Sequence, residues 1–354
     1  MSNLYDKWFL QDLPLQNRVV MAPLSRARAD DPGRTPNKLM ELYYQQRSSA
    51  GLIITEATHV SNNSVSRPFS PAIDDDRKIP AWAPIPKAVQ ARGGRIFLQL
   101  YHVGRKAAVQ QMPNNISPLA PSSIPAVGKV TTTQGKKPFG APREMSREDI
   151  DAVICEFRSA AVRAQKAGFD GVEIHAGNGY LIDQFIRNSS NRRMDGYGGT
   201  IARRLRLLIE IVDTILCIVP GIQVGVRITP RDMSDGCADT DPLRVFVEIS
   251  NALASRNIAY LHVSEGVGAD NQYSLTPVIR EKFTGALIAC GGFTKASAEQ
   301  WIQSGQADLI AFGTHFIANP DLPRRLALGE PLTAAKREYY RKGGALGYTD
   351  YAFL

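Results

Sequence analysis

The sequence predicts an α/β fold, a single (β/α)8 TIM barrel with an N-terminal hairpin plug and a long excursion after the third strand. Short apolar runs alternate with longer amphipathic patterns along most of the 354 residues, as in parallel strands joined by crossover helices. Eight strand candidates can be counted, and the length suits one barrel domain, residues 1–354, with insertions. No G-x-G-x-x-G motif follows the first strand, which disfavours an open dinucleotide-binding sheet.

The predicted strands are short, rich in β-branched residues, and mostly end in polar residues or glycine. They are residues 17–24, 51–57, 95–101, 171–176, 224–230, 259–265, 286–292 and 309–316. Amphipathic patterns fill the gaps, most clearly where the Ser146 cap and an acidic first turn lead into a run that stops at Gly168. The predicted helices are residues 36–49, 80–91, 146–167, 200–219, 242–256 and 295–304.

Two segments fall outside this repeat. Residues 7–15 contain Asp12-Leu13-Pro14 and are expected to form a hairpin that plugs the N-terminal end of the barrel. Residues 106–143 are too long and too rich in Pro, Ser and Thr for a crossover helix. We therefore expect them to form a loop-like excursion at the catalytic face.

Composition excludes several classes of function. The net charge of +8 comes from Lys and Arg scattered along the chain, as in Arg203-Arg204-Leu205-Arg206 and Arg324-Arg325, and solvated helix faces explain it better than a nucleic-acid surface does. No apolar run has the length of a membrane span, and the first residues lack a signal-peptide pattern, so we expect a cytoplasmic protein. The cysteines show neither zinc spacing nor a disulfide framework; they are Cys155, Cys217, Cys237 and Cys290.

Polar residues follow the fourth predicted strand, where barrel active sites lie. His175 and Asn178 stand in the run HAGNGY, whose glycines let the chain turn off the strand so that both side chains can converge on one ligand atom. Two such donors would polarise a carbonyl oxygen and stabilise a developing enolate. Tyr180 adds a phenol that stays protonated at neutral pH. A lone histidine would more often be a hydrogen-bonded strand end, but this clustering favours catalysis.

Two further polar residues interrupt apolar strands. A charge such as that of Arg227 is costly inside an apolar run unless it is paired. Either the ring of a bound flavin or an internal acid such as Glu173, Glu56 or Asp232 would supply the counter-charge, and spacing alone does not choose between them. Gln99 would bond the polar edge of a ring, or else pack inside the barrel.

Glycines end the seventh and eighth predicted strands, where barrels often build a phosphate site from backbone N–H groups. Gly291 and Gly292 precede Phe293, and Gly313 precedes Thr314. This pattern suggests a phosphorylated cofactor, although glycine at a strand end is also ordinary turn chemistry.

Together these residues resemble the Old Yellow Enzyme family of flavin ene-reductases, which includes the plant 12-oxophytodienoate reductases. The resemblance covers nearly the whole chain and rests on eight stretches in the same order, among them LQLYHVGR and FDGVEIHAGNGYLIDQF. It supports the barrel fold. The matching stretches are residues 17–26, 55–58, 98–105, 169–185, 189–191, 226–228, 317–322 and 347–351.

The resemblance implies noncovalent FMN, reduced by NADPH with NADH as the second candidate, and an enone, enal or nitroalkene as the small-molecule substrate. Hydride would pass from the flavin N5 to the β-carbon. His175 and Asn178 match the substrate-oxygen pair, and Tyr180 matches the acid that protonates the α-carbon. The other implied substrate contacts are Tyr101, Tyr340 and Tyr348. The implied FMN contacts are Pro23, Leu24, Ser25, Ala57, Gln99, His175, Arg227, Gly291, Gly292, Phe293, Gly313 and Thr314.

Three positions depart from the family pattern. Ser25 stands where similar members of the family usually have Thr, so the hydroxyl is kept. Thr314 replaces a phosphate-binding Arg, which removes a bidentate charged contact and predicts weaker FMN retention. Tyr101 replaces a Trp, which predicts a changed substrate preference.

Two other functions compete with this one. A flavin-free barrel lyase or isomerase would use the glycine segments to hold a substrate phosphate, and the Thr314 departure favours it. A noncatalytic protein that binds FMN or an enone is the second, and the complete set of His175, Asn178 and Tyr180 speaks against it. The oligomeric state, monomer or homodimer, is open at this point.

Overall fold

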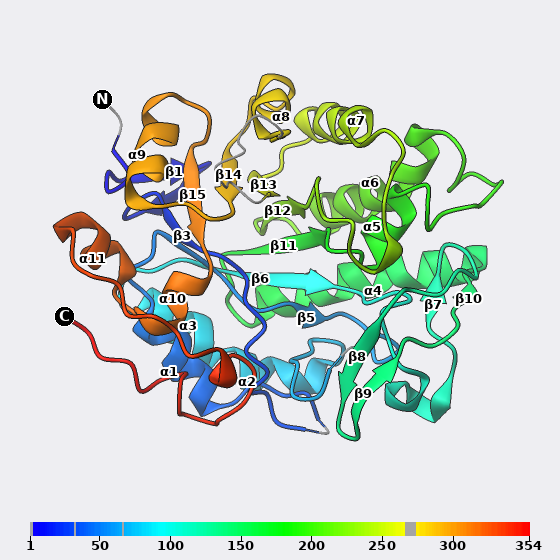
Figure 1. Cartoon of the computed structure of the whole chain (residues 1–354), viewed down its shortest axis with the longest axis horizontal. Helices are drawn as coiled ribbons and strands as arrows, with labels where there is room; N and C mark the ends of the chain where they lie inside the picture. The colour runs from blue at the N-terminus through cyan, green and yellow to red at the C-terminus, as the bar shows by residue number, and fades with distance from the viewer. Residues whose placement is uncertain (1–2, 32, 66, 266–273) are drawn as a thin grey trace.

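The computed structural model describes residues 3–31, 33–65, 67–265 and 274–354, and it contains the predicted barrel (Figure 1). Eight parallel strands close on themselves, because β15 pairs with β3 and β6 pairs with β11. A short ninth strand, β5 (Thr58–His59), also pairs with β6. The barrel strands are β3 (Val19–Met21), β4 (Leu52–Ile54), β6 (Ile96–Tyr101), β11 (Gly171–Ala176), β12 (Gln223–Ile228), β13 (Tyr260–Ser264), β14 (Leu287–Cys290) and β15 (Leu309–Phe312).

The lower barrel interior is an apolar layer in which large rings face glycines. A Cβ atom on Gly225 would lie 2.1 Å from the Tyr260 ring, and one on Gly171 would lie 2.4 Å from the Phe97 ring. Only glycine therefore fits at these two positions. The remaining buried members of the layer are Leu10, Leu15, Val20, Ala22, Leu52, Ile54, Ala259, Ile288, Leu309 and Ala311.

A polar layer lies directly above it. Side chains two positions apart on a strand share a face, so Gln99 follows Phe97 and His262 follows Tyr260. Glu173 stands opposite Gln99 in the strand register, and Arg227 stands opposite His262. The alternation therefore carries polar groups toward the carboxyl ends of the strands.

Helices surround the barrel. Ser146 caps α4 through a capping box with Asp149, as predicted. The predicted helix 80–91 is instead two helices, because Pro84 has no N–H to continue the first. The helices are α1 (Lys38–Gln46), α2 (Ile79–Trp82), α3 (Pro84–Gln90), α4 (Arg147–Lys166), α5 (Leu181–Ile186), α6 (Ile201–Ile218), α7 (Pro242–Ala254), α8 (Thr276–Lys282), α9 (Lys295–Gln303), α10 (Thr314–Ala318) and α11 (Leu322–Leu328).

Several predicted boundaries were wrong. The first strand occupies only Val19–Met21 of the predicted residues 17–24. The eighth ends at Phe312, because the chain turns at Gly313 and continues as α10. The sequence analysis did not predict α5, α8, α10 or α11, which are at most seven residues long and span too few turns to show a clear helical period.

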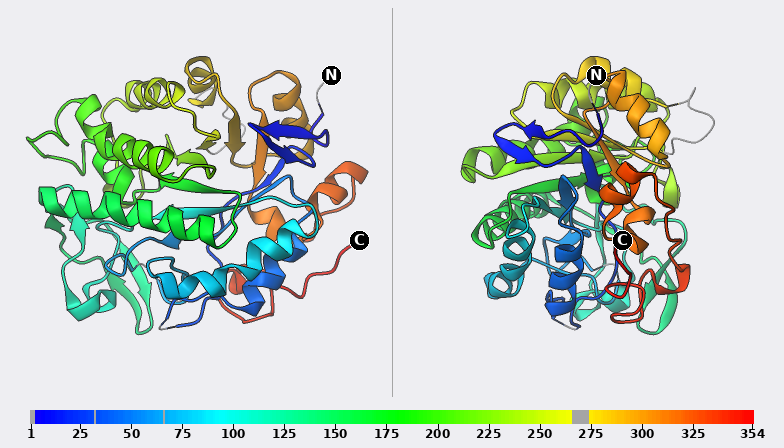
Figure 2. Two further views of the ribbon diagram at one scale, coloured as in Figure 1. Left: turned by 180° about the vertical axis from the view of Figure 1, so that it is seen from behind. Right: turned by 90° about the vertical axis from the view of Figure 1, so that its left-hand side faces the viewer.

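The predicted N-terminal hairpin is confirmed. Strands β1 (Trp8–Leu10) and β2 (Leu13–Leu15) pair antiparallel, and Leu10 and Leu15 pack into the lower apolar layer. The hairpin lies at the end of the molecule from which the strands start, as both views in Figure 2 show. It therefore closes the bottom of the barrel.

The excursion after β6 is more ordered than predicted. It contains an antiparallel hairpin, β8 (Lys129–Thr132) with β9 (Gly135–Pro138), and a short parallel pair, β7 (Leu119–Ala120) with β10 (Arg143–Glu144). Figure 1 shows these strands at the end toward which β6 and β11 point. Their predicted position at the carboxyl face is therefore correct, and the loop description was wrong.

Two adjacent residues test the role of the hairpin. Leu10→Ala should lower the free energy of unfolding by about 2–5 kcal/mol, because its side chain is fully buried. Phe9→Ala is the matched control, since Phe9 is 65% exposed, and it should change stability by less than about 0.5 kcal/mol. Urea unfolding measures both variants. If both variants lost the same free energy of unfolding, the result would show that the hairpin does not plug the barrel.

Candidate functional site

The segment after β11 turns sharply off the barrel. Gly177 packs against Thr229, where a Cβ would come within 2.6 Å of the Thr229 hydroxyl. Asn178 adopts a left-handed backbone with φ of 54°, and Gly179 follows with φ of 67°. The backbone N–H of Asn178 donates to the Thr229 hydroxyl at 2.7 Å. This turn brings Asn178 and Tyr180 to the end of the barrel, as predicted.

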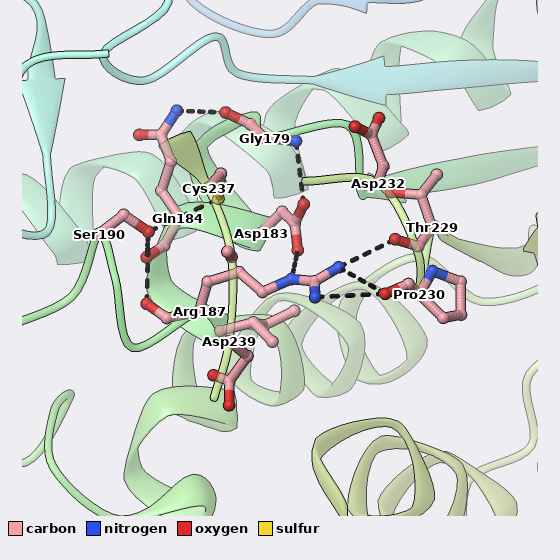
Figure 3. A network of polar contacts seen from close by, with 12 residues as sticks. Gly179, Asp183, Gln184, Arg187, Ser190, Thr229, Pro230, Asp232, Cys237 and Asp239 are labelled. Atoms are coloured by element: carbon pink, nitrogen blue, oxygen red, sulfur yellow. Dashed lines mark hydrogen bonds and ion pairs between the residues drawn. The ribbon is translucent and has the colours of Figure 1, made fainter. Parts of the chain in front are cut away.

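A buried ion pair holds the turn from below (Figure 3). The Asp183 carboxylate accepts the Gly179 N–H at 2.9 Å and the Arg187 Nε–H at 2.9 Å. Arg187 also donates to the carbonyls of Thr229 and Pro230, at 2.9 and 3.3 Å. Both charged side chains are fully buried. The pair therefore ties the ends of two neighbouring strands together.

Asn178 contacts three charged groups. Its Nδ2 donates to Asp232, and its Oδ1 accepts from Arg227 Nη1 at 3.3 Å. Its backbone carbonyl accepts from Lys106 Nζ at 2.9 Å. The amide nitrogen has two hydrogens, so one N–H is not used by Asp232. The convergence of this N–H with His175 on a ligand atom stays a prediction.

His175 is held as a neutral imidazole. Burial, and next the charge of Arg227, lower its pKa well below 6.5. Its Nδ1 is buried and has no hydrogen-bond partner among the described residues. A neutral, orphaned ring nitrogen is suited to a ligand that completes its hydrogen bonding.

Tyr180 packs beside His175. The two rings meet edge to face at 5.3 Å, and Tyr101 meets Tyr180 in the same way at 5.1 Å. Lys106 Nζ lies 4.7 Å from the centre of the Tyr180 ring and is paired with Asp235. Ala57 packs in the same cluster. The fold therefore gathers predicted residues from three separate strands.

Arg227 forms no ion pair within the described part of the chain. Its guanidinium donates to Asn178 and, at 3.1 Å, to the Ser264 hydroxyl, while its buried Nε has no partner there. The acids proposed as alternatives are used elsewhere: Glu173 binds three other groups, and Asp232 binds Asn178. A costly charge is left facing the site, which favours a ligand as its partner.

Glu173 binds those three groups inside the barrel. Gln99 Nε2 donates to it at 2.6 Å, the Tyr260 hydroxyl at 3.1 Å, and His262 Nδ1 lies 2.8 Å away. Burial acts to lower the pKa of His262, but the Glu173 carboxylate and Cys290 more than offset it and raise that pKa. Gln99 therefore packs inside the barrel, which is one of the two predicted alternatives. Its predicted contact with the edge of a ligand ring stays a prediction.

The segment after β3 forms a wall of the site. Glu56 accepts the backbone N–H groups of Arg26 and Ala27 at 3.0 and 3.1 Å. These bonds fix the segment Pro23 to Ser25 relative to Ala57. Leu24 also reaches the end of β15, where a Cβ on Gly313 would lie 3.4 Å from its side chain. Leu24 therefore adjoins the glycine segment after β15, while flavin contacts of Pro23, Ser25 and Ala57 stay predictions.

The glycines after β14 and β15 line one cavity of about 220 Å³. Gly291 and Gly292 both have positive φ, at 133° and 73°, so side chains there would be strained. Thr314 is exposed at the rim. A neighbouring cavity of about 280 Å³ shares Gly291 and reaches Asn178 and Asp232. The predicted phosphate segments thus meet in space and open toward the turn at Asn178.

The two C-terminal tyrosines differ. Tyr340 lines a cavity of about 630 Å³ at the mouth of the site. Tyr348 is fully buried and stacks on Tyr43, with ring centres 4.0 Å apart. Tyr348 presents no surface to a ligand in this structure, so its contacts give the predicted substrate role no support.

Sequence reasoning missed residues that position the site. Asp183 and Arg187 stand four residues apart within an apolar helix, LIDQFIR, and this spacing could have indicated an ion pair. Lys106 was placed in a loop without a role. Among the described residues, no group of three or more His, Cys, Asp or Glu side chains could hold a metal ion, and no helix could span a membrane.

A closed parallel barrel with these side chains and a glycine-lined cavity at its carboxyl face has the architecture of a barrel enzyme for a phosphorylated ligand. The model of the "NADH:flavin oxidoreductase / NADH oxidase family" matches residues 8–333. The chain belongs to this family, the Old Yellow Enzyme group of FMN-dependent oxidoreductases. Family membership overturns the flavin-free lyase or isomerase alternative.

Individual relatives agree. A putative 12-oxophytodienoate reductase 4 from Oryza sativa subsp. japonica is 38% identical, covering 96% of this chain and 90% of the relative. The Old Yellow Enzyme homologue from Zymomonas mobilis is 40% identical with a TM-score of 0.96, over the whole of both chains. Morphinone reductase in complex with tetrahydroNAD is 38% identical with a TM-score of 0.94, covering 100% and 98% of the two chains.

Glu56 should make stability depend on pH. Burial raises its pKa from 4.5 to about 7. The stability linked to this group is therefore present below pH 4.5 and is lost as the pH rises through 7. Between pH 5 and pH 8 the wild type should lose about 2 kcal/mol relative to Glu56→Gln.

Urea unfolding at several pH values measures this difference. Glu330→Gln, at an exposed position, is the control and should follow the wild type. Parallel pH curves for the wild type and Glu56→Gln would contradict the assignment.

Proposed function

We propose that the protein is an FMN-dependent ene-reductase that reduces the C=C bond of α,β-unsaturated carbonyl or nitro compounds with NADPH, or with NADH. The observation that carries this proposal is the arrangement at the carboxyl face. Arg227, which has no ion-pair partner among the described residues, lies there with the neutral His175 and the phenol of Tyr180, in a member of a flavin oxidoreductase family. Cytoplasmic location and oligomeric state stay predictions.

The residues present fit FMN. Arg227 and His175 each keep a buried nitrogen without a partner in the described structure, which a ligand would satisfy. Pro23, Leu24, Ser25 and Ala57 would form the wall along the flavin ring. Gly291, Gly292, Phe293, Gly313 and Thr314 would hold the phosphate through backbone N–H groups and the Thr314 hydroxyl, because they line one cavity.

Bound FMN would supply the hydride, from N5 to the β-carbon of the substrate. Arg227 would place its positive charge at the flavin ring. His175 and Asn178 would donate hydrogen bonds to the carbonyl or nitro oxygen and stabilise the negative charge that develops on it. The neutral state of His175 suits this role, since it donates without giving up its proton.

Tyr180 would protonate the α-carbon. Its ring packs against that of His175, with the ring centres 5.3 Å apart, and this supports a ligand shared by the two side chains. Tyr101 and Tyr340 would border the substrate; Tyr101 is held by a 3.0 Å bond from its hydroxyl to His59 Nε2. The buried position of Tyr348 leaves it out of this proposal.

The relatives support this chemistry by their names. 12-Oxophytodienoate reductase and morphinone reductase are both named for the reduction of oxo compounds. The complex with tetrahydroNAD shows that morphinone reductase accommodates a nicotinamide dinucleotide. These facts concern the relatives, and they make an enone and a reduced nicotinamide the first ligands to test here.

The first test follows flavin absorbance between about 350 and 500 nm during anaerobic mixing with NADPH and then cyclohexenone. The wild-type band should bleach with NADPH and return with the enone. Tyr180→Phe should bleach at the wild-type rate, whereas the return should slow by about 10²–10⁴-fold, because only that step needs the proton.

Each failure has its own meaning. Bleaching without any return with enones or nitroalkenes in the wild type would favour the noncatalytic binding protein. A return in Tyr180→Phe as fast as in the wild type would remove the acid role of Tyr180 for this substrate while leaving the reaction class intact.

Thr314 should weaken FMN retention. Thr314→Arg restores a cation at the exposed rim of the glycine cavity and should lower the Kd for FMN by about tenfold or more, through a charge-assisted phosphate contact. Fluorescence titration of apoprotein with FMN measures the Kd. Riboflavin, which lacks the phosphate, is the control ligand, and its Kd should not change. Equal effects on both ligands would contradict a phosphate site at residue 314.

A further inference from the structure

A second cavity, of about 630 Å³, opens at the mouth of the site. It lies between residues 67–69, the turn of the β8–β9 hairpin at residues 131–133, and the C-terminal residues 337–342. Its volume is in the range of small-molecule sites. None of the roles proposed above uses this cavity except through Tyr340 at its wall.

The cavity is strongly cationic. Its lining carries four positive side chains, Arg67, Arg337, Arg341 and Lys342, and one carboxylate, Glu338. None of the four cationic groups forms a side-chain hydrogen bond or ion pair within the described residues, whereas most other arginines of the chain are paired there. Unpaired cations that share one cavity repel each other, and a bound anion would relieve this repulsion.

The cavity adjoins the catalytic end. Arg67 and Arg341 line it together, and so does Ala27. The backbone N–H of Ala27 donates to Glu56 at 3.1 Å, and the next residue, Ala57, packs against the same apolar cluster as Tyr180. The cavity is therefore linked to the proposed proton donor through a short series of contacts.

The C-terminal wall is held rigidly by two buried arginines. Arg26 Nε donates to the carbonyl of Tyr340 at 2.9 Å, and Arg28 donates to those of Tyr339 and Lys342. Arg341 is thus presented by a fixed backbone. A fixed backbone lowers the entropy that a ligand must offset when it binds.

Phe69 adds an apolar surface. Its side chain is 47% exposed and its backbone has φ of 60°, which is uncommon for a bulky residue. The bond from Ala29 N–H to the Phe69 carbonyl holds it there. An exposed ring beside four cations suits a ligand that combines a flat or apolar part with an anionic group.

We propose that this cavity binds the phosphate or carboxylate of a molecule whose reacting end lies beside Tyr180, and that Arg67 and Arg341 contact the anion. The proposal rests on the proposed function for the position of the reacting end. Two ligands could bring the anion, the phosphates of the nicotinamide reductant or the carboxylate of an acidic enone. Both use the same chemistry, a charge-assisted bond to a guanidinium.

The test measures binding by calorimetry to the oxidised holoenzyme, in which no turnover takes place. The probes are 2′,5′-ADP with adenosine as its neutral partner, and 4-oxopent-2-enoate with its methyl ester. Arg341→Glu should weaken at least one anionic probe by about tenfold or more and leave the neutral partners unchanged. Arg67→Glu should act in the same direction, and it keeps the test open if one variant folds poorly.

Arg203→Glu is the matched control, because Arg203 is exposed on α6, away from the cavity, and should change no affinity. Weakening of 2′,5′-ADP alone assigns the cavity to the reductant; weakening of the enoate alone assigns it to the substrate. Anionic probes that do not bind the wild type, that bind every variant equally, or that weaken together with their neutral partners overturn the proposal. If the protein showed no ene-reductase turnover, the proposed function would be wrong. These binding data would still decide whether the cavity binds anions.

Discussion

The interior of the barrel depends on the fully buried carboxylate of Glu173. A buried charge is stable only when its hydrogen bonds are made, and here three groups from two strands make them: Gln99 on β6, and Tyr260 and His262 on β13. This network belongs to the polar layer of the barrel interior, which lies above the lower apolar layer. Because Glu173 is occupied by these partners, Arg227 on the neighbouring strand is left for the ligand side.

The same principle governs the turn that carries the proposed catalytic groups. Asn178 adopts a left-handed conformation that costs free energy, whereas Gly179 adopts one without strain, and the Asp183–Arg187 pair below them compensates by fixing Gly179 to the end of β12. The strained turn is therefore supported by a buried charge pair, and Tyr180 inherits a defined position from it. The strained backbone of Asn178 and the buried Asp183–Arg187 pair thus occur together where the chemistry is expected.

The arginines show how misleading a net charge can be. The charge of +8 suggested solvated helix faces, yet Arg204 is buried against Asp239 and Arg325 against Asp321, both within runs read as surface. Others, such as Arg26 and Arg28, bind backbone carbonyls of the C-terminal segment. Once these are accounted for, the cavity cations Arg67, Arg337, Arg341 and Lys342, which have no ion-pair partner in the described part of the chain, stand out as a local feature rather than part of a general positive surface.

The sequence by itself determined the barrel, the plug and the polar strand ends, because strand alternation, the capping box and the residues HAGNGY are local patterns. Family resemblance added the proposed roles of His175, Asn178 and Tyr180. Only the tertiary structure decided that Arg227 forms no ion pair with the acids proposed for it, that Tyr348 is buried, and that cations gather at residues 67 and 341. Such facts depend on side chains from distant segments meeting in space, and no local pattern encodes which of several equally spaced partners will meet.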